Sequence, residues 1–161
     1  WLIDAGLAYK VQRVNAPRLP FKFYEDLNAF KLFMLDVGLM GAMAETSAES
    51  MLVGDNVFSE YKGAFTELFV FTQLKSRHFS LYYHAVESST IEIDFLTQWH
   101  DRVIPIEVKA EVNVKAKSLH TFINNNPELQ GLRFSMLPYK KQDWVINVPL
   151  YACLVPFDYY R

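Results

Sequence analysis

Cysteine is nearly missing from this chain of 161 residues, in which Cys153 stands alone. One cysteine excludes an intramolecular disulfide and fits a reducing compartment, so a cytoplasmic location is expected. Long apolar runs are missing as well. No run approaches the roughly 20 residues that span a bilayer, and nothing resembles a signal peptide, so no membrane contact is expected.

Several motifs that bind nucleotides or carry nucleophiles are also absent. The sequence has no glycine-rich phosphate loop, no Walker-type lysine and no dinucleotide fingerprint, so no known motif for nucleotide binding is present. No serine stands in a nucleophile-elbow context. The histidines are scattered and Cys153 is isolated, which disfavours zinc. A net charge of −2 excludes binding to nucleic acid by bulk charge alone.

Apolar residues are plentiful. They make up 51% of the chain, and 16% of it is aromatic, which is enough for a dense core. The length suits one domain, or one domain with a small appendage. The first residue, Trp1, is not Met and lies in an apparent helical pattern. The chain is therefore expected to be the C-terminal part of a longer protein.

The first part of the chain predicts a winged-helix-like or a capping segment over residues 1–45, and the two alternatives stay open. Residues 1–7 read as the end of a helix. Short strands are expected at 8–14, 21–24 and 31–35, with a turn near 26–28. Asp36 is a plausible N-cap for a helix that begins at Val37.

Residues 56–161 predict an α/β domain with helices on both sides of a mixed sheet. The expected elements are a helix over about 58–77, strands at 81–85, 91–99 and 102–110, a helix at 115–124, strands at 132–137 and 144–148, and a closing helix at 149–155. The first three strands are expected to form a meander. The first helix is apolar almost all the way round, which is typical of a buried helix, and Glu67 lies in the middle of it.

The stretch IEIDFLTQWHDRVIPIEVKA, residues 91–110, reads as two alternating strands. In the first strand the apolar side consists of Ile91, Ile93 and Phe95, with Glu92 and Asp94 opposite. In the second it consists of Ile104, Ile106 and Val108, with Glu107 and Lys109 opposite.

A turn at His100 and Asp101 would place Asp94 across from Glu107, and Glu92 across from Lys109. Opposed side chains lie about 5 Å apart, and two facing carboxylates repel unless a cation lies between them. This pairing predicts a metal site.

Oxygen ligands suit a hard cation such as Mg²⁺ or Mn²⁺. The expected ligands are the carboxylates of Asp94, Glu107 and Glu67 and the carbonyl of Val108. Lys109 would orient an attacking water or stabilise charge on a phosphate, so Asp94, Glu107 and Lys109 are the expected catalytic residues. Two alternatives stay open for Glu67: a basic or backbone group satisfies it, or it joins the acidic patch. Glu92 is the expected structural partner of Lys109.

A local basic surface is also expected between Val112 and Gln142, where one acid, Glu128, stands among several bases. These bases are Lys115, Lys117, Arg133, Lys140 and Lys141.

Asp94 followed by Glu107-Val108-Lys109 resembles the PD-(D/E)xK nuclease motif, and Glu67 matches the acid that these enzymes often carry on the preceding helix. Most of the chain also resembles a domain of unknown function that follows AAA-type ATPase modules in bacteria and archaea. The stretches that carry this second resemblance are KLFMLDVGLM (31–40), YKGAFTELFVFTQL (61–74), IEIDFL (91–96) and IPIEVKA (104–110).

These resemblances imply a restriction-endonuclease-like core, an ATPase module upstream in the same protein, and DNA as a partner. One departure is Ile93, which stands where the classical motif has proline.

The leading hypothesis is therefore a metal-dependent nuclease-like domain that acts on DNA phosphodiesters. The alternatives are a non-catalytic DNA-binding or regulatory module of the ATPase and a pure interaction domain. Fixed salt bridges at Glu67 or Asp94, with no room for a cation, would favour binding without cleavage.

Overall fold

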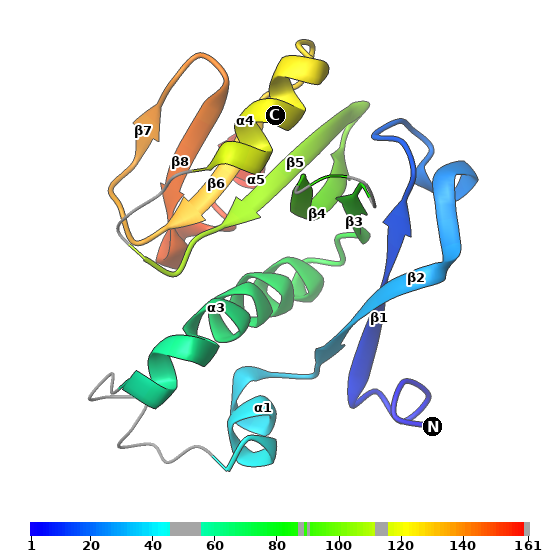
Figure 1. Cartoon of the computed structure of the whole chain (residues 1–161), viewed down its shortest axis with the longest axis vertical. Coiled ribbons are helices and arrows are strands. Elements are labelled where there is room, and N and C mark those ends of the chain that lie inside the picture. The colour runs from blue at the N-terminus through cyan, green and yellow to red at the C-terminus, as the bar shows by residue number, and fades with distance from the viewer. Residues whose placement is uncertain (46–55, 87–88, 90, 112–115, 160–161) are drawn as a thin grey trace.

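The computed structural model of the chain describes residues 1–45, 56–86, 89, 91–111 and 116–159 (Figure 1). Its strands are β1 (Ala8–Val14), β2 (Glu25–Met34), β3 (Leu81–Ala85), β4 (Glu92–Trp99), β5 (Arg102–Val108), β6 (Gly131–Ser135), β7 (Lys140–Lys141) and β8 (Val145–Pro149). Its helices are η1 (Phe21–Tyr24), α1 (Val37–Met43), α3 (Asn56–Ser76), α4 (Lys117–Asn125), η2 (Leu150–Ala152) and α5 (Pro156–Tyr159). The fold is a mixed α/β structure.

All the strands belong to one mixed sheet of eight strands in the order β2-β1-β3-β4-β5-β6-β8-β7. The predicted meander is confirmed, because β3, β4 and β5 are antiparallel neighbours. The strands β5, β6 and β8 are parallel, and this arrangement requires crossover connections, one of which contains α4.

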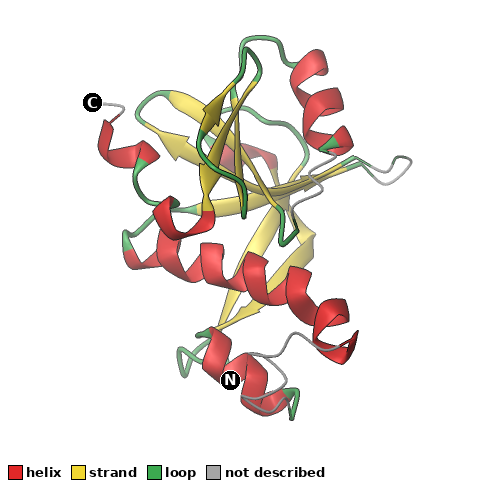
Figure 2. Ribbon diagram, turned by 90° about the vertical axis from the view of Figure 1, so that its left-hand side faces the viewer, coloured by secondary structure: helices red, strands yellow, loops and turns green. Residues whose placement is uncertain are grey.

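Helices α3 and α4 pack on opposite faces of the sheet (Figures 1 and 2). One core cluster joins α3 residues such as Leu68 and Phe71 to Phe95 of β4 and Ile106 of β5. A second cluster joins α4 residues to another set of sheet side chains, including Ile93. The layering of helices on both sides of the sheet is confirmed. The helix that the sequence predicts to be buried between layers is buried on one side only, since Tyr61, Gly63 and Ala64 of α3 are exposed.

The N-terminal strands extend the same sheet, since β1 pairs with β2 on one side and with β3 on the other. Val11 and Phe33 belong to the core cluster of α3. The boundary expected between residues 45 and 56 falls on residues that the structure does not describe, so the division into 1–45 and 56–161 stays a prediction.

Three expectations for the chain ends are wrong. Residues 1–7 form hydrogen-bonded turns and not a helix end. Residues 21–24 form η1. The strand β2 continues through the expected turn at 26–28, but its register on β1 shifts there, because Gln12 pairs with Phe30 whereas Arg13 pairs with Asp26. The closing helix is split into η2 and α5, with Pro156 at the start of α5. The N-cap at Asp36 is confirmed, because its carboxylate accepts the N–H of Leu39 at 2.8 Å.

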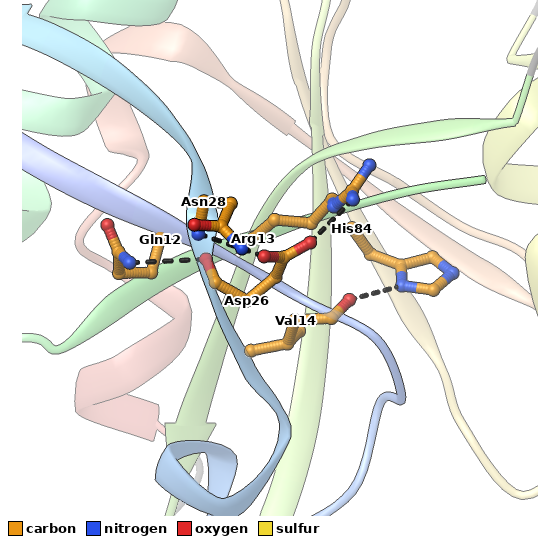
Figure 3. A network of polar contacts seen from close by, with 6 residues as sticks. All are labelled: Gln12, Arg13, Val14, Asp26, Asn28 and His84. Carbon is orange, nitrogen blue, oxygen red and sulfur yellow. Dashed lines mark hydrogen bonds and ion pairs between the residues drawn. The ribbon is translucent and has the colours of Figure 1, made fainter. Parts of the chain in front are cut away.

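A polar network holds the N-terminal hairpin to the sheet (Figure 3). Arg13 of β1 lies 2.6 Å from the carboxylate of Asp26 on β2, and this contact holds the pKa of Asp26 below its usual value. The Nδ1–H of His84, on β3, donates to the carbonyl of Val14 at 2.8 Å. His84 therefore ties β3 to the end of β1.

The packing of α4 on β6 leads to a prediction about two glycines. A Cβ at Gly131 would lie 3.0 to 3.2 Å from side-chain atoms of Leu119, which is fully buried on α4. Gly131→Ala is expected to destabilise the protein by about 1–3 kcal/mol, as overpacking does. Gly63 lies in α3 with nothing within 4 Å of the same position. Gly63→Ala is therefore expected to stabilise the protein by about 0.5–1 kcal/mol.

Chemical unfolding of both variants measures these effects side by side. The substitution is the same at both positions. Changes of the same sign in the free energy of unfolding would therefore contradict the packing of α4 against β6.

Candidate functional site

The hairpin of β4 and β5 has the register that the sequence predicts. Phe95 pairs with Ile106, and Trp99 pairs with Arg102 across a turn at His100 and Asp101. His100 adopts a φ of 51°, in the left-handed region that tight turns often use. The hairpin therefore brings Asp94 to the level of residues 107–109, where the sequence placed it.

A bulge in β4 changes which side chains share a face. On the other side of β4, Tyr82 pairs with Leu96 and His84 pairs with Ile93, so two β4 residues oppose the single residue Tyr83. These two residues are Asp94 and Phe95. Phe95 packs in the α3 cluster, whereas Ile93 and Leu96 pack in the α4 cluster. The expectation that Phe95 lies on the same side as Ile93 is wrong, because the bulge interrupts the alternation.

Asp94 is anchored to the backbone of β5. Its Oδ2 atom accepts the N–H of Val108 at 2.7 Å. Burial raises the pKa of Asp94 to about 7, and the negative charge of Glu67 on α3 adds to this shift. Asp94 is thus a half-buried carboxyl in the negative field of Glu67, and a nearby positive charge would stabilise its ionised form.

Glu107 is buried, with 3% of its surface exposed. Its Oε1 atom lies 2.6 Å from Nζ of Lys109, and its Oε2 atom accepts the N–H of Leu119 at 3.2 Å. Leu119 lies in the first turn of α4, where free N–H groups favour a negative charge. Glu107 therefore has an ammonium and a helix N-terminus as its neighbours.

The expected pairing of Glu92 with Lys109 is wrong. Glu107 binds Lys109, and Glu92 binds Lys31 of β2, whose Nζ atom lies 2.5 Å from Oε1 of Glu92. The reason is that β2 brings a second ammonium to this end of β4, which the hairpin alone does not reveal.

Lys31 is the residue of this site that the sequence reasoning missed. Its Nζ atom also lies 3.2 Å from Oε1 of Glu67 and 5.1 Å from the centre of the Tyr83 ring. Burial by itself would lower the pKa of Lys31, but the charges of Glu67, Glu92 and Asp94 outweigh this effect and raise it. The ammonium thus lies in the field of three carboxylates.

Both alternatives for Glu67 therefore hold in part. A lysine satisfies its carboxylate, and its charge also acts on Asp94. A signal for Lys31 existed in the sequence, because it is a charged residue at the start of the strand predicted at 31–35 and stands between the apolar residues Phe30 and Leu32. The sequence pattern did not indicate which carboxylates the Lys31 side chain would contact.

The expected basic surface is smaller than the sequence suggests. Arg133 is buried, with 7% of its surface exposed, and its Nε–H donates to Oδ1 of Asn147 at 2.9 Å. Lys115 lies outside the described residues. Lys140 and Lys141 are exposed on the short strand β7, and Lys117 is exposed at the start of α4.

Two protein families match this chain, and the first of them covers the acidic residues of the site. Residues 62–152 match the family described as a domain of unknown function, DUF4143. The match covers more than half of the chain. This chain belongs to the DUF4143 family. Residues 1–50 match a second domain of unknown function, DUF8612.

No curated protein matches the chain, and no solved structure does. Within this DUF4143 chain, Glu67, Asp94, Glu107 and Lys109 fall in the DUF4143 match, and Lys31 falls in the DUF8612 match. The site therefore combines residues from both matched segments.

The donors of the DUF4143 site fit a hard divalent cation in kind but not in arrangement. Glu67 and Asp94 supply oxygen atoms, and the pKa of Asp94 is raised mainly by burial and then by the charge of Glu67, although the Lys31 ammonium opposes this shift. However, no group of three His, Cys, Asp or Glu residues is arranged to hold a metal ion among the residues that the structure describes. The Lys31 ammonium lies against Glu67 and Glu92, and Glu107 binds Lys109.

Other features of the fold lie away from this site. A cleft of about 1090 Å³ lies at the turn end of the β4–β5 hairpin, where His100 and Asp101 line it. In the described part of the chain no helix is long and apolar enough to cross a membrane.

Proposed function

We propose that this chain is a metal-dependent, PD-(D/E)xK nuclease-like domain that acts on DNA phosphodiesters and forms the C-terminal part of an AAA-type ATPase. The single observation that supports this most strongly is the 2.7 Å hydrogen bond from the N–H of Val108 to Asp94. This bond ties Asp94 to the peptide group between Glu107 and Val108, and the charge of Glu107 acts on Asp94. Lys109 follows Val108 directly in the chain, which supports a role for these residues in one site.

Each residue has a role in this proposal. Asp94, Glu67, Glu107 and the carbonyl of Val108 would hold Mg²⁺ or Mn²⁺ once the carboxylates leave the arrangement described above, and the ion would then supply activation of water and neutralisation of phosphate charge. Glu107 fixes the Lys109 ammonium at 2.6 Å. Lys109 is one-third exposed, so it can meet a phosphate or an attacking water from solvent. The burial of Asp94 strengthens its attraction to a cation.

A cleavage assay tests this function. Wild-type protein is incubated with supercoiled, linear and single-stranded DNA and with Mg²⁺ or Mn²⁺. Asp94→Asn and Lys109→Met are each expected to lower the cleavage rate by about 10²-fold or more, because the first removes a proposed metal ligand and the second removes the ammonium that acts on the phosphate or the attacking water. Asp101→Asn is the matched control, since Asp101 is exposed in the turn of the same hairpin.

Cleavage that survives both site variants would contradict the assignment of the residues. The absence of metal-dependent cleavage on every form of DNA would contradict the enzyme itself.

The contact of Lys31 with Glu67 and Glu92 favours a second candidate function, a non-catalytic DNA-binding or regulatory module of the ATPase. In that case DNA binding should weaken steeply as salt rises, because Lys117, Lys140 and Lys141 would contact phosphates. Binding without cleavage, unchanged in Asp94→Asn and weakened in a variant that lacks Lys140 and Lys141, would support this candidate over the first.

A further inference from the structure

The acidic site contains two ammonium groups, and they bind different carboxylates. Lys109 binds Glu107, which also accepts an N–H from α4. Lys31 binds Glu67 and Glu92, and its charge reaches Asp94. The PD-(D/E)xK resemblance accounts for Lys109 but gives no role to Lys31.

The position of Lys31 conflicts with metal binding at the same oxygens. A magnesium ion held by Glu67 and Asp94 would need direct contact with carboxylate oxygens at about 2.0–2.1 Å. An ammonium 3.2 Å from Oε1 of Glu67 competes for that atom and repels a second cation at short range.

We infer that Lys31 is an internal cation of this site, which occupies the carboxylates of Glu67 and Glu92 and competes with the divalent metal ion. The inference rests on the proposed function, because it concerns the same metal. It assigns Lys31 as a positioning residue that sets the affinity of the site for metal.

The backbone of Lys31 is held in place, whereas its side chain has room to move. Its strand is held in place, because Phe33 stacks on Phe71 of α3 with ring centres 4.4 Å apart. Lys31 is itself about one-quarter exposed, and Glu92 is about half exposed. The ammonium can therefore leave Glu67 and stay paired with Glu92 while the strand does not move.

This arrangement links the two matched segments of the chain. Metal binding would require the lysine of the DUF8612 match to release an acid of the DUF4143 match. A contact that draws Lys31 away from Glu67 would raise the affinity of the site for metal. By thermodynamic linkage, bound metal would strengthen that contact by the same factor.

Direct measurement of Mn²⁺ binding, without DNA, tests the inference. Calorimetry and electron paramagnetic resonance compare wild type with Lys31→Met, which keeps the length of the side chain and removes the charge. Lys31→Met is expected to bind Mn²⁺ about 10-fold more tightly, which lies within the usual range of coupling between sites. Lys31→Arg, which keeps the charge, should bind about as wild type does.

Two further variants serve as controls. Lys10→Met removes an exposed lysine on the neighbouring strand, above the ring of Phe30, and should leave Mn²⁺ affinity unchanged. Adding Asp94→Asn to Lys31→Met should abolish the gain in affinity if the metal binds at this site. Lys31→Gln replaces Lys31→Met if the latter lowers the melting temperature before metal is added.

The outcomes separate the two proposals. Equal Mn²⁺ affinity in Lys31→Met and wild type, with binding lost in Asp94→Asn, would overturn the role of Lys31 and leave the proposed function standing. An equal gain in Lys10→Met would also overturn it, because the effect would then reflect net charge. No Mn²⁺ binding in any variant would overturn both proposals.

Discussion

Phe71→Ala is expected to lower the free energy of unfolding by about 3–5 kcal/mol, as removal of a fully buried aromatic ring does. Phe71 lies on α3 and is 1% exposed. Its ring stacks on Phe33 of β2 and packs against Tyr9 of β1 and Phe95 of β4. The substitution would open a cavity where three strands and the helix meet, and a change of this size is a large fraction of the stability of a typical domain.

The matched control for Phe71→Ala is Tyr61→Ala. Tyr61 is an aromatic residue of the same helix with 47% of its surface exposed. Its removal is expected to cost less than about 1 kcal/mol, since surface substitutions usually do. Urea unfolding, followed by circular dichroism, measures both. Similar costs for the two variants would contradict the placement of Phe71 at the centre of the core.

Asp94→Asn is expected to make the protein more stable at neutral pH while it removes the proposed metal ligand. The pKa of Asp94 is raised from 3.8 to about 7 by burial and by the charge of Glu67. Between these pH values the unfolded chain releases a proton that the folded protein keeps. The stability that this group contributes is therefore complete below about pH 4 and is lost as the pH rises through about 7.

Asparagine stays neutral throughout and can still accept the N–H of Val108. In the presence of a chelator, the free energy of unfolding of Asp94→Asn should match that of wild type near pH 4 and exceed it by about 2 kcal/mol near pH 8. Asp101→Asn, on the exposed turn, should show no such change with pH. A difference between Asp94→Asn and wild type that does not vary with pH would contradict the half-buried environment of Asp94 in the field of Glu67.

Much of the core follows from patterns that are local in the sequence. The strands at 8–14 and 81–85 and the hairpin register around His100 could be predicted, because alternation and turn residues act over short stretches. The long helix with Glu67 could also be predicted from its apolar content. These features place the acids at one end of the β4–β5 hairpin.

The details of the site could not be predicted, because they depend on neighbours far away in the chain. The bulge at Asp94 and Phe95 arises from the pairing of β4 with β3, and the sequence IEIDFL gives no sign of it. The pairing of Glu92 with Lys31 depends on the position of β2 in the sheet. The N–H of Leu119 reaches Glu107 only because the crossover returns α4 to this face.

The sharing of one core cluster by the N-terminal hairpin and α3 has a practical consequence for dissecting the protein. A fragment that begins at residue 56 would keep Glu67, Glu92 and Asp94 but lose Lys31, so their negative charges would repel one another without the ammonium that lies among them. It would also expose the Phe71 ring that Phe33 covers. We expect such a fragment to aggregate, and the two family segments to unfold together as one cooperative unit in the whole chain.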